Sequence, residues 1–99
     1  MTARDNEEER GYHVRGRVQG VGFRWWTRRT AAALGLSGSV CNRRDGSVDV
    51  LVRGEREVLD QLERSLWVGP PGAAVDQVDR WECDLSIAKG EFRIVQPGN

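Results

Sequence analysis

The chain has few of the residue types that build metal centres, disulfide frameworks or membrane spans. Its two cysteines, Cys41 and Cys83, fit no CxxC or Cys/His spacing, so we expect both to be reduced packing residues. The single histidine, His13, has no second ligand near it in the sequence, which favours a surface imidazole on a strand over a metal ligand. We therefore predict neither a metal nor any other cofactor.

Long apolar runs are also missing from the chain. No segment approaches the roughly 18 apolar residues of a membrane-spanning helix, and residues 1–10 lack the apolar core of a secretory signal. These absences predict a cytoplasmic protein without a membrane partner. The 1–10 segment is polar, acidic and without periodicity, which is typical of a disordered arm. With 38% hydrophobic residues and four tryptophans, residues 11–96 are predicted to form a single folded domain, followed by a tail at 97–99.

The net charge at pH 7 is zero, but the two halves of the chain differ in sign. Residues 1–50 contain nine arginines and six acidic residues, whereas residues 51–99 contain six basic and nine acidic residues. No acid occurs between Tyr12 and Arg29, where the arginines are Arg15, Arg17, Arg24, Arg28 and Arg29. Such a cluster attracts a small anion. A net charge of zero lacks the basic footprint of nucleic-acid-binding proteins, so no nucleic-acid partner is expected.

Hydrophobic periodicity and turn residues predict seven secondary-structure elements. In chain order these are a strand from Tyr12 to Gln19, a helix at 24–34, strands at 36–42 and 47–53, a helix at 55–67, and strands at 74–82 and 91–96. Right-handed crossovers in the two strand–helix–strand units put both helices on one face of an antiparallel sheet. The predicted fold is therefore α+β, a ferredoxin-like split βαβ sandwich.

The first predicted strand runs into a glycine-containing turn at a helix start, the segment Gly16-Arg17-Val18-Gln19-Gly20-Val21-Gly22-Phe23-Arg24. Amides of such a turn can point inward, and the helix dipole adds partial positive charge there. Arg24 supplies a planar fork of donors for phosphate oxygens. A cation is disfavoured at a helix N-terminus unless an anion is bound there. The alternatives are that the glycines only permit a tight turn and that Arg24 points to solvent.

Asn42 ends the second predicted strand, and in this topology that strand end can lie close to the glycine turn. Its amide offers a donor and an acceptor that could hold a water molecule. Taken alone, Asn42 could equally bond its own backbone beside the following turn. Trp25 and Trp26 could form a stacking platform for bases, but helical spacing favours a core position for Trp26 and the surface for Trp25.

The 16–24 segment, together with Asn42, Asp45-Gly46-Ser47-Val48 and Gly54, resembles the two signature blocks of the acylphosphatase family. The resemblance covers residues 12–95 and implies hydrolysis of acyl phosphates to a carboxylate and inorganic phosphate, by direct attack of water and without a metal. It implies that Arg24 binds the substrate phosphate and that Asn42 orients the attacking water. The implied phosphate cradle consists of backbone amides from Gln19, Gly20, Val21, Gly22, Phe23 and Arg24.

Two positions differ from the family pattern. Ser39 stands where a large aromatic residue is usual, and Cys41 stands where a long, often basic side chain is common. Both bear on strand packing and on the wall of the cleft, and hence on substrate preference. Because the chain has no heptad seam or large extra apolar strand, we expect a monomer, with inorganic phosphate as product or competitive ligand. The competing hypotheses are a non-catalytic phosphate-binding module and an RNA-binding ferredoxin-like module.

Overall fold

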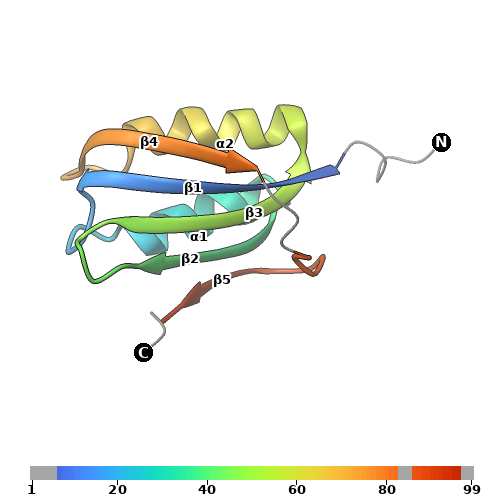
Figure 1. Ribbon diagram of the computed structural model, residues 1–99, viewed down its shortest axis with the longest axis horizontal. Helices are drawn as coiled ribbons and strands as arrows, with labels where there is room; N and C mark the ends of the chain where they lie inside the picture. The colour runs from blue at the N-terminus through green and yellow to red at the C-terminus, as the bar shows by residue number, and fades with distance from the viewer. Residues whose placement is uncertain (1–6, 83–85, 97–99) are drawn as a thin grey trace.

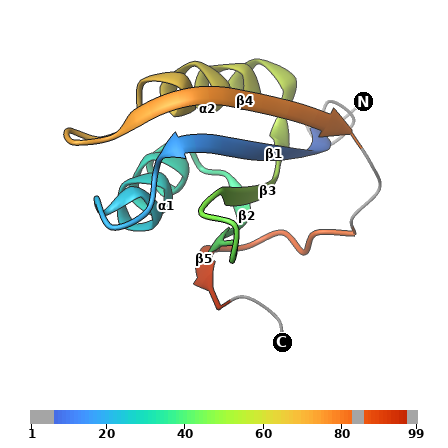
Figure 2. The same ribbon diagram turned by 60° about the vertical axis from the view of Figure 1, so that its left-hand side comes forward.

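The computed structural model describes residues 7–82 and 86–96 and has two layers, with two helices covering one face of a five-stranded sheet (Figures 1 and 2). The predicted order of elements and the ferredoxin-like α+β fold are confirmed, with bounds that move by a few residues. The elements are β1 (Glu7–Arg17), α1 (Phe23–Ala33), β2 (Ser37–Asn42), β3 (Val48–Glu55), α2 (Arg56–Val68), β4 (Ala74–Glu82) and β5 (Phe92–Val95).

The strands follow the order β4-β1-β3-β2-β5 across the sheet. The pairs that involve β1 and β3 are antiparallel, but β5 pairs with β2 in parallel. The sheet is therefore mixed, and the prediction of an antiparallel sheet is wrong at this edge. The chain leaves β4 at the end of the sheet where β2 begins, so a strand laid beside β2 from that end runs parallel to it (Figure 1).

The start of β1 corrects the predicted disordered arm. Residues 7–10 belong to the strand and pair with β3 in antiparallel register, whereas residues 1–6 lie outside the described part. Their acidic side chains meet arginines of other elements: Arg53 Nε donates to Glu7 Oε1 at 3.0 Å, and Arg56 Nε donates to Glu8 Oε2 at 2.7 Å. These ion pairs offset the mutual repulsion of the acidic side chains. The sequence pattern alone does not indicate these partners, so it predicts a solvated segment.

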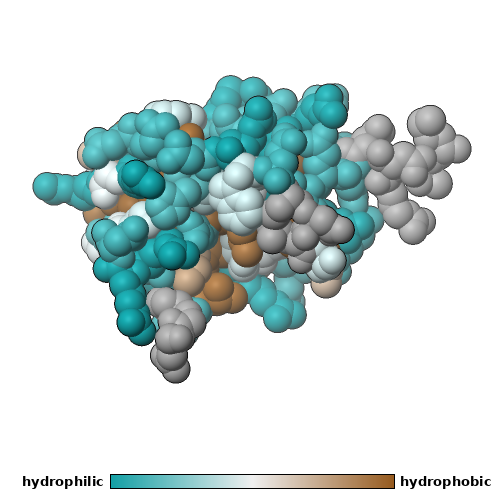
Figure 3. Space-filling model, in the orientation of Figure 1, coloured by the Kyte–Doolittle hydropathy of each residue, from teal (hydrophilic) through white to brown (hydrophobic). Residues whose placement is uncertain are grey.

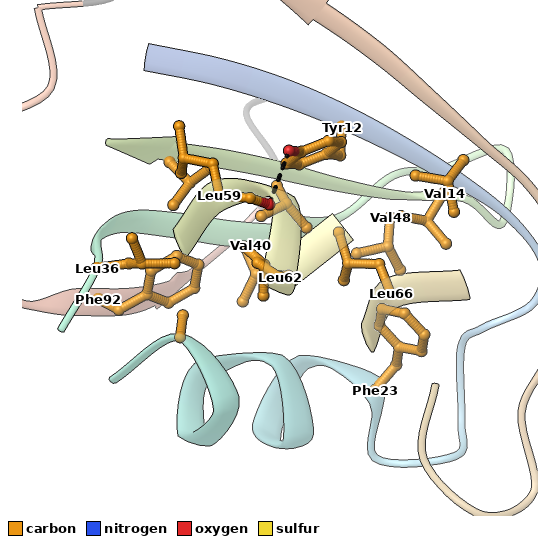
Figure 4. Close-up of a cluster of buried hydrophobic side chains, with 14 of the residues drawn as sticks. Tyr12, Val14, Phe23, Leu36, Val40, Val48, Leu59, Leu62, Leu66 and Phe92 are labelled. Atoms are coloured by element: carbon orange, nitrogen blue, oxygen red, sulfur yellow. Dashed lines mark hydrogen bonds between the residues drawn. The ribbon is translucent and has the colours of Figure 1, made fainter. Parts of the chain in front are cut away.

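The hydrophobic core lies between the sheet and the helices. Figure 4 shows Phe23 of α1 and three leucines of α2 pointing toward valines on the sheet. The Tyr12 hydroxyl donates to the Leu59 carbonyl at 3.2 Å, so this buried phenol keeps a partner. Fully burying each such leucine contributes roughly 1.5–3 kcal/mol. The core anchors both helices and thereby fixes where α1 begins, at the end of the sheet where β1 and β2 terminate.

The opposite face of the sheet carries no helix and is largely hydrophilic (Figure 3). On β1 this open face includes His13, Arg15 and Arg17, which alternate with the buried residues of the core face. No helix among residues 7–82 and 86–96 is both long and apolar enough to cross a membrane. Cys83, predicted to be a packing residue, and the predicted tail at 97–99 lie outside the described residues.

Candidate active site

The turn between β1 and α1 has the backbone form that its glycines favour. Gly20 and Gly22 adopt φ values of 75° and 78°, in the left-handed region that costs glycine little and other residues more. Gly22 is the N-cap of α1 and its carbonyl accepts the first bond of the helix, from Trp26 N–H at 3.0 Å. Left-handed glycines in a turn allow successive backbone amides to point toward the same side, which is the arrangement of anion-binding turns.

The backbone amides of this turn are available to a ligand. Within the described chain, no N–H group of residues 19–24 donates a hydrogen bond to another protein atom. No side chain caps the start of α1, and its first turn contains no acidic residue. Unpaired amides at a helix N-terminus carry partial positive charge and form an anion site. The turn thus keeps the amides that the sequence predicted for phosphate binding.

Arg24 lies in the first turn of α1, half-buried, and makes no ion pair with any acid in residues 7–82 or 86–96. Arg28 follows one turn later on the same face, where its Nε donates to the Phe92 carbonyl of β5 at 3.4 Å. The helix packs against β2 and β5, and its buried residues are Phe23, Thr27 and Ala31, whereas Arg28 is exposed. A guanidinium near amides that already carry positive charge favours a bound anion.

Asn42 is the last residue of β2, and it pairs with Val48 of β3. Val40 and Val48 are both buried in the core, so the alternation of the strand places Asn42 on the helix-facing side. Its Oδ1 atom is buried and accepts no hydrogen bond from the described residues. A buried acceptor of this kind normally has a partner, and water is a common one. The alternative, a bond to its own backbone, is not found in the described chain.

Asp45, rather than Asn42, hydrogen-bonds to the backbone of the turn that follows β2. Its Oδ1 accepts hydrogen bonds from the backbone N–H and the hydroxyl of Ser47, at 3.0 and 2.5 Å. These bonds lower the pKa of the Asp45 carboxyl, first through the Ser47 hydroxyl and then through its backbone amide. The Arg43 N–H also donates to the Ser47 carbonyl at 2.8 Å, which closes the turn. The β2–β3 turn is therefore stable without the amide of Asn42.

The side chain of Gln19 joins the two loops of the site. Its Nε2 donates to the Arg43 carbonyl at 2.7 Å and to the Ser47 carbonyl at 2.9 Å. Gln19 precedes Gly20 in the β1–α1 turn, whereas Arg43 follows Asn42 directly. Figure 1 shows both loops at the same end of the sheet. The structure therefore brings the amide turn, Arg24 and Asn42 to one end of the molecule, although no direct hydrogen bond joins the side chains of Arg24 and Asn42 in the described chain.

Sequence reasoning missed this role of Gln19, which it assigned only a backbone amide. The one available signal was its position, a polar side chain directly after the buried end of a strand. His13 also differs from expectation: its side chain is only 19% exposed, and its Nδ1 lies 2.7 Å from Asp49 Oδ1. Asp49 Oδ2 accepts in turn from Arg43 Nη1 at 2.8 Å, and this bond raises the pKa of Arg43. His13 thus helps to hold the β2–β3 turn rather than standing alone at the surface.

The two adjacent tryptophans differ in burial, as their helical spacing predicted. Trp26 is half-buried and its ring centroid lies 5.4 Å from that of Phe23, at the edge of the core. Trp25 is 63% exposed. Among the residues that the structure describes, no cluster of three or more His, Cys, Asp or Glu side chains could hold a metal ion.

Known proteins match the chain over nearly its whole length. A family model described as acylphosphatase matches residues 10–94. An acylphosphatase of Mesorhizobium japonicum is 46% identical over 92 residues, which cover 91% of this chain and 98% of that protein. One from Koribacter versatilis is 49% identical over 90 residues, 91% of this chain and 82% of that protein. The solved structure of an acylphosphatase from Coxiella burnetii has a TM-score of 0.87 at 38% identity, covering 96% of this chain and all of that one.

Fold and sequence together define an α+β enzyme of the ferredoxin-like type, in which the backbone amides before its first helix have no partner in the described chain. The chain belongs to the acylphosphatase family, whose members are hydrolases that act on acid anhydrides. The resemblance seen in the two sequence blocks is thereby confirmed.

Proposed function

We propose that this protein hydrolyses the carboxyl–phosphate anhydride bond of acyl phosphates, giving a carboxylate and inorganic phosphate, by direct attack of water. One observation carries the proposal: the amides of residues 19–24 and the Arg24 guanidinium have no hydrogen-bond partner in the described chain, and Arg24 belongs to the first turn of the helix that this segment begins. That arrangement matches the charge and the several oxygen acceptors of a phosphoryl group.

Phosphate binding is assigned to the β1–α1 turn. The backbone amides of Gln19, Gly20, Val21, Gly22, Phe23 and Arg24 donate to the phosphoryl oxygens, and the guanidinium of Arg24 adds charge-assisted bonds. Phosphoryl transfer depends mainly on placement and on stabilising the charge of the phosphoryl oxygens. One preorganised donor is worth about 3 kcal/mol at the barrier, so a ring of amides with one arginine supplies a large part of the acceleration.

Water positioning is assigned to Asn42. Its buried Oδ1 lacks a partner in the part of the chain described, on the helix-facing side of β2. A carboxamide oxygen accepts a hydrogen bond from water and so fixes where the oxygen lone pair points. Gln19 holds the turn that follows Asn42 against the phosphate turn, so the attacking water and the phosphorus keep a fixed relation.

The leaving group explains why so few side chains are needed. An acyl phosphate releases a carboxylate, which is stable as an anion at neutral pH and needs no strong general acid. The site then has to bind, orient and stabilise charge, which amides and one guanidinium do without changing their own protonation. A site that needs no general acid is compatible with the few polar side chains proposed to act at this end of the sheet.

The proposed ligands are small acyl phosphates, with inorganic phosphate as product and competitive ligand. We place the enzyme in the cytoplasm as a monomer, without nucleic-acid or membrane partners. The free thiol of Cys41 supports a reducing compartment. The open face of β1 carries His13, Arg15 and Arg17 rather than the stacking aromatics of an RNA-binding sheet, which supports a small anion over RNA.

The test compares the two side chains of the site by release of inorganic phosphate from benzoyl phosphate. Arg24→Ala should lose turnover and raise the inhibition constant of inorganic phosphate by at least about tenfold, because a charge-assisted clamp is removed. Asn42→Ala should lower kcat by about a hundredfold while that inhibition constant stays within about twofold, because only the water loses its partner.

Equal loss of phosphate affinity in both variants would rule out this division of roles. Two control reactions test the reaction class itself: p-nitrophenyl phosphate should be a poor substrate, and a chelator should leave the rate unchanged. Phosphate binding without any turnover of benzoyl phosphate would identify a non-catalytic phosphate-binding module instead.

A further inference from the structure

A groove lies between α1 and α2, the two helices on one side of the sheet (Figure 2). Each helix packs more extensively on the sheet than on the other helix, which leaves this space open to solvent. Its volume is about 860 Å³. Small-molecule sites in proteins have volumes of roughly 300–1,000 Å³ and often lie between helices. Neither Asn42 nor any residue of the β1–α1 turn lines the groove, so it is separate from the candidate active site.

Part of the groove surface is apolar. Trp26 and Leu34 of the α1 segment are half-buried against the core, and Val68, the last residue of α2, is 74% exposed. The Trp26 ring centroid lies 5.4 Å from that of Phe23, so core packing holds this indole in place. Single exposed apolar residues are common, but apolar side chains that gather in a concave surface are typical of a binding site. They provide a surface for the aliphatic or aromatic body of a ligand.

The same groove is lined by one arginine from each helix, Arg29 of α1 and Arg64 of α2. Neither arginine forms an ion pair within the described part of the chain, and no acidic residue described there lines the groove. Asp60, one turn before Arg64, is instead paired with Arg10 and Arg80. A lone exposed arginine is ordinarily solvated. Two unpaired guanidinium groups beside an apolar surface, without an acid to neutralise them, complement an anion.

We propose that this groove binds a small amphipathic carboxylate, with its apolar body against the three apolar side chains and its head group at Arg29 and Arg64. The planar guanidinium presents a fork of donors that fits the two oxygens of a carboxylate. The apolar body supplies affinity by leaving water, and the charged head sets which ligands are accepted. The proposal does not depend on the hydrolysis of acyl phosphates, because the groove shares no residue with the candidate active site.

The test measures the Kd of decanoate by isothermal titration calorimetry at constant ionic strength. The wild type should bind one decanoate per chain. Arg29→Gln and Arg64→Gln should each raise Kd at least about threefold, and the double variant about tenfold, because partly exposed charge-assisted bonds are lost. Arg44→Gln removes an exposed arginine from the β2–β3 turn and is the matched control, with Kd expected within about twofold of the wild type. Equal effects in the groove variants and in this control would overturn the proposal.

Two further ligands separate the head group from the apolar body. Decyltrimethylammonium has the same chain with the opposite charge, and butyrate has the same head on a short chain. Both should bind at least about tenfold more weakly than decanoate. Equal binding of the cation would show a non-specific apolar surface, and equal binding of butyrate would show that the apolar side chains play no part. Either result would contradict an amphipathic site.

Two variants distinguish the groove from other places where a carboxylate could bind. Arg24→Ala removes the cation at the start of α1 and should leave the Kd of decanoate within about twofold, whereas loss of binding would place the carboxylate at the β1–α1 turn instead. Val68→Ser should raise that Kd about threefold, because an apolar contact is lost. Analytical ultracentrifugation without ligand should show the same monomer for the wild type and Val68→Ser. A wild-type dimer that Val68→Ser dissociates would assign the groove to a second copy of the chain and overturn the carboxylate site.

Discussion

At the scale of single residues, the side chain of Gln19 orders the candidate site, although its position in the sequence gives little indication of this role. Its carboxamide donates both hydrogens to the β2–β3 turn, to carbonyls that close the segment after Asn42. Each of these bonds links two loops that are far apart in the chain. Loss of such a link leaves each loop folded but lets Asn42 move relative to the β1–α1 turn, and misplacement of a group by about 1 Å is costly in catalysis.

We expect Gln19→Ala to lower kcat by about tenfold while the inhibition constant of inorganic phosphate changes by less than about threefold. The backbone amides and Arg24 remain in place, so phosphate binding is largely kept, whereas the position of Asn42 is no longer fixed. Steady-state kinetics with benzoyl phosphate give both constants. A merely structural role would instead reduce the folded fraction without changing kcat per folded molecule.

Gln19→Glu is the matched variant, because it keeps the shape of the side chain and removes both donors. Its carboxylate would face two carbonyl oxygens, so kcat should fall at least as far as in Gln19→Ala. A Gln19→Ala enzyme with the kcat of the wild type would show that the link between the loops plays no part in turnover.

At the scale of elements, the first residues of β1 tie the strand to α2 and β4 through Arg10. The Arg10 side chain is 3% exposed, and its Nη1 donates to Asp60 Oδ1 at 2.8 Å and to the Tyr12 hydroxyl at 3.1 Å. Burial alone would lower the pKa of Arg10, but these two hydrogen bonds raise it above its usual range. The same bond from Arg10 lowers the pKa of Asp60 below its usual value. Arg80 of β4 also lies within 3.7 Å of Asp60, so three elements share one charge cluster.

Arg10→Ala should lower the free energy of unfolding by about 2–3 kcal/mol, measured by urea denaturation. This is less than the roughly 3–5 kcal/mol for breaking a fully buried pair, because the acids that remain are partly open to water. The exposed pair of Arg56 with Glu8 is the control, and Arg56→Ala should lower the free energy of unfolding much less than Arg10→Ala does. Similar losses in the two variants would contradict the special role of Arg10.

The pH dependence gives a second readout of the same cluster. The folded pKa of Asp60 is lower than its unfolded value near 3.8, so its ion pair stabilises the fold fully above that value. That stability is lost as the pH falls below 3.8 and through the folded pKa. The free energy of unfolding should therefore fall less steeply with acid in Arg10→Ala than in the wild type.

At the scale of the whole molecule, the uneven charge affects how a substrate reaches the site. Arg15 and Arg17 are exposed on β1, which leads into the phosphate turn, and neither pairs with an acid in the described chain. Together with Arg24 they give this end of the molecule a positive potential, although the net charge is zero. Such a potential accelerates the arrival of an anion and is screened over about 10 Å at 0.1 M salt.

Raising sodium chloride from about 20 mM to about 500 mM should lower kcat/KM for benzoyl phosphate several-fold and leave kcat nearly constant. Steering acts on encounter and not on the bound complex, so only the second-order constant responds. Arg17→Gln should flatten this dependence, with Arg44→Gln in the β2–β3 turn as the comparison. A fall in kcat with salt, or equal slopes in all three proteins, would exclude steering by β1.

Much of this architecture could be predicted because it depends on local patterns. Alternating apolar residues and the Asp45-Gly46 turn located the hairpin, and the glycines and Arg24 marked the start of a helix with free amides. The beginning of β1 and the direction of β5 could not be found this way. Both depend on partners distant in the chain, arginines of β3 and α2 in the first case and the exit end of β4 in the second.

The sequence by itself determined the order of the elements, the ferredoxin-like fold and the turn with its amides and Arg24, because periodicity, glycine conformation and helix polarity act over a few residues. Only the tertiary structure decided that Gln19 joins the β1–α1 turn to the segment after Asn42, and that Arg28 of α1 reaches the Phe92 carbonyl of β5. Those relations join atoms from separate elements, so they exist only after the core has fixed how the helices lie on the sheet.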